Sequence, residues 1–301
     1  KLGFGASRTM RIAQKLYEGI NIGSETTGLI TYMRTDGVQL SSQAIEELRN
    51  EISNRHGKSY IPDNPRVYKS KAANAQEAHE AIRPTDIARD PESISNYLDA
   101  EQLKLYDLIW KRTISSQMQS AELDETAADI SSKDASITFR ANGSQVIFPG
   151  FFVYRDKEDD RLLPNLNEKE EVDLSKVESD QHFTQPPPRY TDASLIKKME
   201  ELGIGRPSTY ASILQVLINR NYVEKEKGKH IPQERGRILT AFLNNFFGKY
   251  IEYDFTAELE KKLDTVSDGK LNYKKLLEEF WDSFKPHLDK MSNLERDKIL
   301  E

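Results

Sequence analysis

The sequence predicts an α+β protein of several domains, mainly helical, with a small antiparallel β domain in the middle. Apolar residues recur at helical spacing in residues 1–118 and 189–301, whereas in residues 119–188 they come in short runs that alternate with polar residues. The middle block holds 7 Lys and Arg against 15 Asp and Glu, so it carries the acidity behind the net charge of −6. Prolines 186–188 form a stiff linker at its end. Three domains with these bounds are therefore expected.

The first block is predicted to be helical with one extended stretch. Ser7 can cap a helix that Gly19 ends. Residues 28–33 begin with β-branched and aromatic side chains and lead into a Thr-Asp-Gly turn, which predicts a strand. A further short helix is expected around residues 75–82, and it must end before Pro84.

The other two blocks carry clear turn signals. In the middle block, Asn142-Gly143 lies between two apolar runs and predicts a hairpin turn. The third block gives a helix over 193–202, a glycine-rich turn over 203–209, a second helix and then two strands around Lys227-Gly228. That order is typical of a winged helix-turn-helix, whose second helix meets nucleic acid.

Composition excludes several classes of protein. With no cysteine there is no disulfide framework, no thiol nucleophile and no Cys-ligated zinc. No run approaches the ~18 apolar residues of a membrane-spanning helix. A cytoplasmic setting is expected, and because the chain opens on Lys1 we expect a piece of a longer protein. The acidic balance argues against a nucleic-acid partner only for the middle block.

Tyr32, Arg34 and Asp36 form the first candidate site. On an extended chain Tyr32 and Arg34 share a face. An arginine beside a tyrosine favours the phenolate, which is a suitable nucleophile towards phosphorus, and the guanidinium could hold the phosphate under attack. Asp36 could orient Arg34. The alternative is a half-buried strand tyrosine beside a surface arginine.

His79 and Arg83 form the second candidate. On a helix they lie four residues apart on one face and could grip a phosphate together. Glu77 and Glu80 flank the histidine, yet no second histidine lies at the spacing that a zinc helix needs. A lone surface histidine is the alternative.

Arg206, Ser208 and Thr209 form the third candidate, in the turn before the second helix of the helix-turn-helix. Free backbone N–H groups at a helix N-terminus favour phosphate, and these side chains would line that end. The alternative is a two-helix corner in which glycine permits close packing.

Three stretches together resemble, in order and spacing, the type IA DNA topoisomerases, and among them the bacterial topoisomerase I group. They are residues 28–36 (GLITYMRTD), 75–84 (AQEAHEAIRP) and 202–210 (LGIGRPSTY). The resemblance covers essentially the whole chain, because it extends to Thr9, Met10, Ala13, Gln14, Leu16, Tyr17, Glu18, His182, Phe183, Thr184, residues 253–257, Glu260, Leu263 and Asp264.

The resemblance implies that Tyr32 is the nucleophile that forms a 5′-phosphotyrosyl link to one DNA strand. Arg34 matches the phosphate-binding arginine of the family, and His79 matches its histidine near the cleaved strand. The resemblance and the local chemistry together place further residues at the DNA-binding surface, namely Asp36, Arg83, Arg206, Ser208 and Thr209. The three blocks would be the mobile domain with the tyrosine, a β arch that hinges it, and part of the base of a toroidal ring. Gly37 departs from the serine usual in bacterial members.

The resemblance also implies what this chain lacks. The family's N-terminal Toprim domain supplies an acidic Mg²⁺ site, and no match to it or to the C-terminal zinc ribbons is present. The nearest acidic run, Glu158-Asp159-Asp160, is read as a solvated turn, so no metal ligands are assigned and no cofactor is expected in the fragment itself. We expect a monomer that binds single-stranded DNA and the Toprim domain, in a bacterial cytoplasm at the nucleoid, and that does not relax DNA alone.

Two other functions stay open from the sequence. The chain could be a non-catalytic single-stranded DNA-binding module with a vestigial tyrosine. A tyrosine recombinase also uses Arg, His and Tyr, but its tyrosine normally follows the basic residues, whereas Tyr32 precedes His79 and Arg206. The order disfavours that class.

Overall fold

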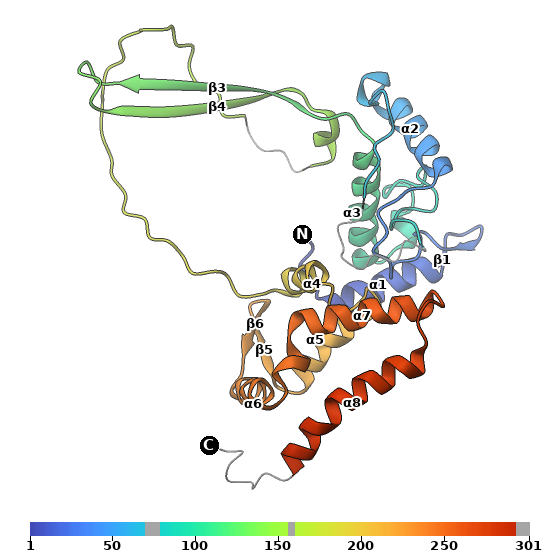
Figure 1. The fold of residues 1–301 in the computed structure, drawn as a ribbon. Helices are drawn as coiled ribbons and strands as arrows, with labels where there is room; N and C mark the ends of the chain where they lie inside the picture. The colour runs from blue at the N-terminus through green and yellow to red at the C-terminus, as the bar shows by residue number, and fades with distance from the viewer. Residues whose placement is uncertain (70–78, 156–159, 293–301) are drawn as a thin grey trace.

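A computed structural model describes residues 1–69, 79–155 and 160–292 (Figure 1). Its helices and strands, in chain order, are α1 (Ala6–Glu18), β1 (Ile20–Asn21), β2 (Thr26–Thr27), α2 (Ser42–His56), α3 (Ala100–Ser116), β3 (Glu122–Ser131), β4 (Thr138–Phe148), α4 (Asp192–Glu201), α5 (Tyr210–Asn219), β5 (Val223–Glu226), β6 (Lys229–Pro232), α6 (Glu234–Ile251), α7 (Tyr253–Ser267) and α8 (Tyr273–Ser292). Short 3₁₀ helices cover Lys58–Tyr60, Ser95–Tyr97 and Gly150–Tyr154.

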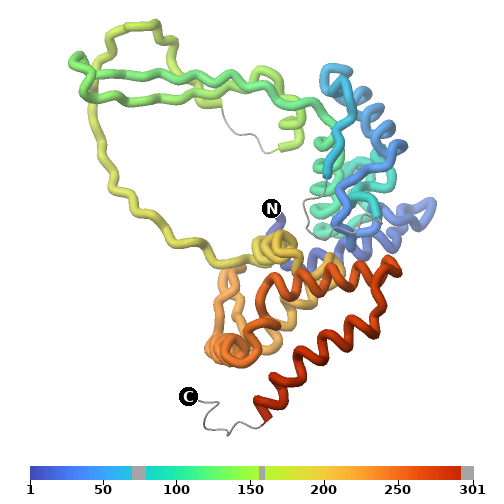
Figure 2. The backbone as a smooth tube through the Cα atoms, viewed as in Figure 1, coloured from blue at the N-terminus to red at the C-terminus, as the bar shows by residue number. Residues whose placement is uncertain are grey.

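The chain folds into two helical parts joined by a long β hairpin. Helices α1 to α3 lie together, β3 and β4 project from them as an antiparallel pair, and α4 to α8 lie beside α1 (Figure 1). Residues 162–190 form no helix or strand and run, almost wholly exposed, from the hairpin back to α4 (Figure 2). In the described part of the chain, each sheet has two antiparallel strands. The mixed, mainly helical class is confirmed.

The principal core lies in the first block, where α1, α2 and α3 pack around the loop that follows Gly28. Its buried members are Ile12, Ala13, Leu16, Leu29, Ile30, Met33, Leu48, Ile52, Ile87, Ile94, Leu105, Tyr106, Trp110, Ile114 and Met118. Leu29, Ile30 and Met33 stand immediately beside Tyr32, so the candidate nucleophile sits on a loop that is anchored in this core.

The third block follows the predicted order of helix, turn, helix and hairpin. The β5–β6 pair turns at Lys227 and Gly228, both with positive φ, as the sequence predicts. Asp192, the first residue of α4, joins this block to the first, because its Oδ2 accepts the N–H of Ala6 at 2.8 Å. None of the described helices is both long and apolar enough to cross a membrane.

The predicted turn at Asn142-Gly143 is wrong. The hairpin turns at residues 132–137, where Asp134 accepts hydrogen bonds from Ser132 and Ser136. Gly143 instead pairs with Thr126 inside β4, and a Cβ there would lie 2.8 Å from the carbonyl oxygen of Arg161. The glycine therefore admits a third segment against β4 rather than making a turn.

The local predictions for the first block are wrong in three places. Residues 28–33 form no strand, only a single bridge between Ile30 and Pro84, because their partner is a short irregular segment. Residues 79–82 are not helical, since they run alongside that loop, and residues 75–78 of the expected helix lie outside the described residues. Ser7 does not cap α1; Gly5 stands at the N-cap, and Asp192 supplies the acceptor instead.

Candidate active site

Tyr32 is half-buried and lies against two other rings. Tyr17, from the last turn of α1, packs edge-to-face with it, with ring centroids 5.4 Å apart and an interplanar angle of 71°. The imidazole of His79 lies 4.9 Å away, tilted by 50°. The structure therefore brings together two of the three predicted catalytic residues, although they are 47 positions apart in the sequence.

The loop that carries Tyr32 is held by the segment 79–85. Thr31 donates its backbone N–H to the Arg83 carbonyl at 2.9 Å and its hydroxyl to the Ala81 carbonyl at 2.8 Å. Ala81 donates its N–H to the Gln39 carbonyl at 2.8 Å. These bonds fix the two segments in register on both sides of Tyr32, and so they fix the place of His79.

Gly37 allows the same two segments to approach closely. A Cβ on Gly37 would lie 2.2 Å from the carbonyl oxygen of His79, far inside van der Waals contact. The departure from the serine of the family pattern thus has a structural counterpart: in this protein the turn after Asp36 sits directly on the backbone of His79.

Arg34 and Asp36 differ in their surroundings. Arg34 is exposed, and its side chain makes no hydrogen bond or ion pair with the residues that the structure describes. Asp36 lies close to α5: burial first, and then the negative charges of Glu200 and Asp36, raise the pKa of Tyr210 to about 12. The loop of Tyr32 therefore comes near the start of α5.

Arg83 is engaged within its own segment. Its Nε and one terminal nitrogen donate to Glu80 at 3.0 and 2.9 Å, and the other terminal nitrogen donates to the Pro84 carbonyl at 2.9 Å. Because residues 79–82 are not helical, the helical pairing of His79 with Arg83 does not form. The side chain of Arg83 braces the turn into the proline.

Arg206 is also engaged, with carboxylates of α7. One terminal nitrogen lies 2.7 Å from Asp264 and the other 3.4 Å from Glu260, and the side chain is only 15% exposed. Ser208 and Thr209 are exposed, and the hydroxyl of Thr209 accepts the backbone N–H of Arg206 at 2.9 Å. The turn between α4 and α5 is thus packed against α7 through Arg206, and Ser208 and Thr209 lie on its exposed side.

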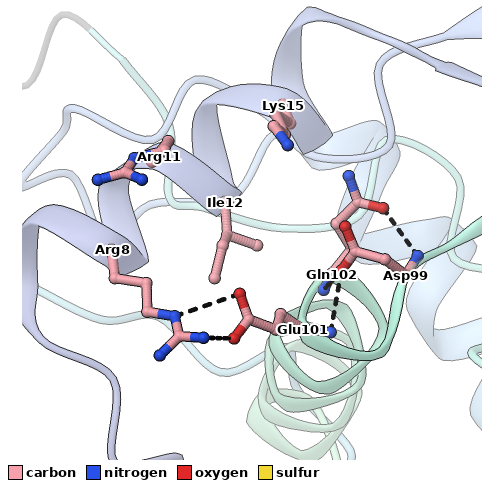
Figure 3. Close-up of a pocket in the computed structure, with 7 residues that line it drawn as sticks. All are labelled: Arg8, Arg11, Ile12, Lys15, Asp99, Glu101 and Gln102. Carbon is pink, nitrogen blue, oxygen red and sulfur yellow. Dashed lines mark hydrogen bonds and ion pairs between the residues drawn. The ribbon is translucent and has the colours of Figure 1, made fainter.

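A cavity of about 360 Å³ between α1 and the start of α3 is a site that the sequence reasoning missed (Figure 3). It is lined by Arg8, Arg11, Ile12, Lys15, Asp99, Glu101 and Gln102. Arg8 forms an ion pair with Glu101, and Asp99 caps α3. Arg11 and Lys15 are exposed, and their side chains form no hydrogen bond or ion pair within the described residues. Helical spacing of the three cations on α1 is the signal that could have found this basic surface.

The residues present do not form a metal site. Across residues 1–69, 79–155 and 160–292, no three His, Asp or Glu side chains are grouped so as to hold a cation. Of the acidic run at 158–160, Glu158 and Asp159 lie outside the described residues, and Asp160 accepts the N–H of Val146 at 3.1 Å. No chemical step is therefore assigned to Mg²⁺ at these residues.

Comparison with known proteins decides the family. A model described as DNA topoisomerase matches residues 1–278. The chain belongs to this family. DNA topoisomerase 1 of Rickettsia conorii is 53% identical over 307 residues, which cover all of this chain and 40% of that protein. DNA topoisomerase 1 of Xylella fastidiosa (strain Temecula1) is 48% identical over 308 residues, covering 98% and 38%.

The fold agrees with a solved member of the family. Full-length topoisomerase I from Thermotoga maritima matches with a TM-score of 0.85 at 40% identity, over 95% of this chain and 47% of that one. The chain spans about 40% of the length of the curated topoisomerases it matches. The family resemblance stated from the three motifs is confirmed.

Proposed function

We propose that this chain carries the nucleophile and part of the DNA-binding surface of a type IA topoisomerase, which cuts one DNA strand, passes the other and reseals the cut, relaxing negative supercoils. The observation that carries the proposal is the environment of Tyr32. In a chain of this family, the Tyr32 ring is half-exposed on a loop that hydrogen bonds hold in place. It lies against His79 and two residues from Arg34, which has no partner among the described residues.

The proposed reaction exchanges one phosphoester for another. The Tyr32 oxygen attacks a backbone phosphorus, the bond from phosphorus to the 3′-oxygen breaks, and a 5′-phosphotyrosyl ester forms. The phenol gives up its proton, and the departing 3′-oxygen takes one up. Because no water is consumed, attack of the 3′-hydroxyl on the phosphotyrosine reverses the step and reseals the strand.

Arg34 is the residue best placed to meet the phosphate. A phosphate that approaches Tyr32 would find a guanidinium with no protein partner in the described chain, and it would gain a charge-assisted pair without breaking an existing one. His79 would contact the same phosphate group from the neighbouring segment.

The residues predicted to bind DNA would not all contact it directly. Ser208 and Thr209, exposed before α5, would bind backbone phosphates. Arg206 and Arg83 would act indirectly, because carboxylates already hold their guanidinium groups, and Asp36 would act at the contact with Tyr210.

A Toprim portion would complete this active site, and Mg²⁺ bound there would supply charge stabilisation for the leaving group. We propose that the complete enzyme acts as a monomer on nucleoid DNA in a bacterial cytoplasm. Without the Toprim portion, the chain should bind single strands and not relax plasmid.

The test is transfer of a labelled single-stranded oligonucleotide to the protein, with and without added Toprim portion and Mg²⁺. A covalent adduct should form in the complete mixture, vanish in Tyr32→Phe and persist in the control Tyr97→Phe, an exposed tyrosine. Binding without any adduct in the complete mixture would instead favour the non-catalytic DNA-binding module. A 3′ rather than 5′ link would favour recombinase chemistry.

A further inference from the structure

Tyr17 contacts Tyr32 without filling the core. Tyr17 is 40% exposed, so much of its surface stays in contact with solvent, and its ring packs edge-to-face with that of Tyr32 at a centroid distance of 5.4 Å. Edge-to-face is the favoured arrangement of two aromatic rings, because the positive edge of one meets the negative face of the other. An exposed tyrosine held in this geometry has little to contribute to folding and much to the orientation of its neighbour.

The backbone around Tyr17 is fixed to the loop of Tyr32. Leu29 donates its N–H to the Leu16 carbonyl at 2.7 Å, and both side chains are fully buried. A Cβ on Gly28 would lie 2.4 Å from the carbonyl oxygen of Tyr17, so the glycine allows the loop to lie directly on the last turn of α1. The ring of Tyr17 is thus presented to Tyr32 from a rigid helix.

The two rings beside Tyr32 differ in what supports them. His79 belongs to an irregular segment, whereas Tyr17 lies in the last turn of a helix of 13 residues that packs on the core through Ile12, Ala13 and Leu16. A nucleophile must be held within a narrow range of orientations to attack in line. Of its two ring neighbours, Tyr17 is the one that a helix keeps in place.

We propose that Tyr17 is a positioning residue for Tyr32: its ring, packed edge-to-face with that of Tyr32, holds the phenol in the orientation from which it attacks phosphorus. The proposal rests on the proposed function of Tyr32, and it assigns the role to the ring of Tyr17 rather than to its hydroxyl. It therefore separates two substitutions. Tyr17→Phe keeps the aromatic ring, and Tyr17→Leu removes it.

The experiment uses the complete topoisomerase carrying this sequence, with saturating labelled oligonucleotide. Tyr17→Leu should lower the rate of adduct formation roughly two- to tenfold, as loss of one edge-to-face contact implies. Oligonucleotide affinity by fluorescence anisotropy and the melting temperature should stay unchanged. Tyr17→Phe should restore the rate, and Tyr273→Leu, an exposed tyrosine on α8, should have no effect.

A second measurement follows the Tyr32 ring itself. In protein with ¹³C-labelled tyrosine, the Tyr32 ring signal is the one absent from Tyr32→Phe, and it should move in Tyr17→Leu while staying near its place in Tyr17→Phe. An unmoved signal, an unchanged rate in Tyr17→Leu or no recovery in Tyr17→Phe would overturn the proposal. A parallel loss of affinity would make Tyr17 a DNA contact instead, which also overturns it. If Tyr32→Phe still forms the adduct, the proposed function fails as well.

Discussion

Asp192→Asn should weaken the contact between the first block and the third, because one carboxylate joins three elements. Its Oδ2 accepts the Ala6 N–H, its Oδ1 accepts from His230 at 2.8 Å, and Lys225 lies 2.7 Å from the same oxygen. The Asp192 side chain is 13% exposed and that of His230 is 5% exposed. Asparagine has nearly the same shape, but it replaces one acceptor oxygen by a donor that would face these donors.

The expected loss of folding stability follows from the kind of hydrogen bond that the substitution removes. Hydrogen bonds to a charged group contribute about 1.5–3 kcal/mol each, and they are not additive within one cluster. Asparagine keeps one acceptor, so we expect a loss of about 2–4 kcal/mol rather than the sum. Asp180→Asn is the matched control, because this substitution removes the same charge from a residue in the exposed segment 162–190.

The pH dependence of stability in the acid range provides a second check on the contribution of Asp192. Burial opposes ionisation of Asp192, but hydrogen bonds from Lys225, Ala6 and His230 outweigh it and hold the pKa below the ordinary value of 3.8. A carboxylate with a depressed pKa stabilises the fold above pH 3.8, and it loses that contribution as pH falls through the folded-state pKa. The difference between wild type and Asp192→Asn should therefore shrink below about pH 4.

Scanning calorimetry would measure the loss of stability, and hydrogen exchange at the Ala6 amide would report the contact itself. Faster exchange at Ala6 in Asp192→Asn, but not in Asp180→Asn, is expected. Equal protection of Ala6 in all three proteins, or a melting temperature no lower than that of the control, would refute the reasoning.

Three further substitutions test other contacts. Gly37→Ser should force the turn away from the His79 carbonyl at a cost of about 1–3 kcal/mol and slow adduct formation, which single-turnover assays would show; an unaffected rate would mean that the turn moves freely. Arg206→Ala should lower the melting temperature and leave the salt dependence of oligonucleotide binding unchanged, whereas a log–log slope smaller by about 0.7 would reveal a phosphate contact. Tyr106→Phe should cost about 1–2 kcal/mol in thermal unfolding, because the buried hydroxyl donates to the Arg89 carbonyl at 2.7 Å; a neutral result would contradict that bond.

Elements governed by local pattern could be predicted from the sequence. Helix α4 begins after Thr191 with a complete capping box, and α4, α5 and the β5–β6 hairpin follow the predicted order, with the turn at Lys227 and Gly228. In each case the residues that start and stop the element lie within a few positions of it, so segments distant in the sequence do not change where the element forms.

Predictions failed where distant chain competes with a local signal. Asn142-Gly143 has the strongest local turn chemistry, but the register of β3 with β4 places Gly143 opposite Thr126. Residues 28–33 have strand-like composition, yet the segment that meets them is irregular and is held partly through the side chain of Thr31 instead of a continuous backbone ladder. The partners of Arg83 and Arg206 were likewise not visible, since nothing in their spacing shows which carboxylate each will meet.

The motifs that identify this family thus mix two kinds of residue. Gly28 permits a close approach to α1, Thr31 binds the neighbouring segment, and Arg83 and Arg206 hold carboxylates, so each has a structural reason to be there. A charged residue whose partner is already in the protein must give that partner up to bind a phosphate, whereas Arg34 has none to give up among the described residues. In the proposed function, the chemistry of the site would therefore lie with Tyr32, His79 and Arg34, and the remaining motif residues would set the geometry in which those three meet the DNA.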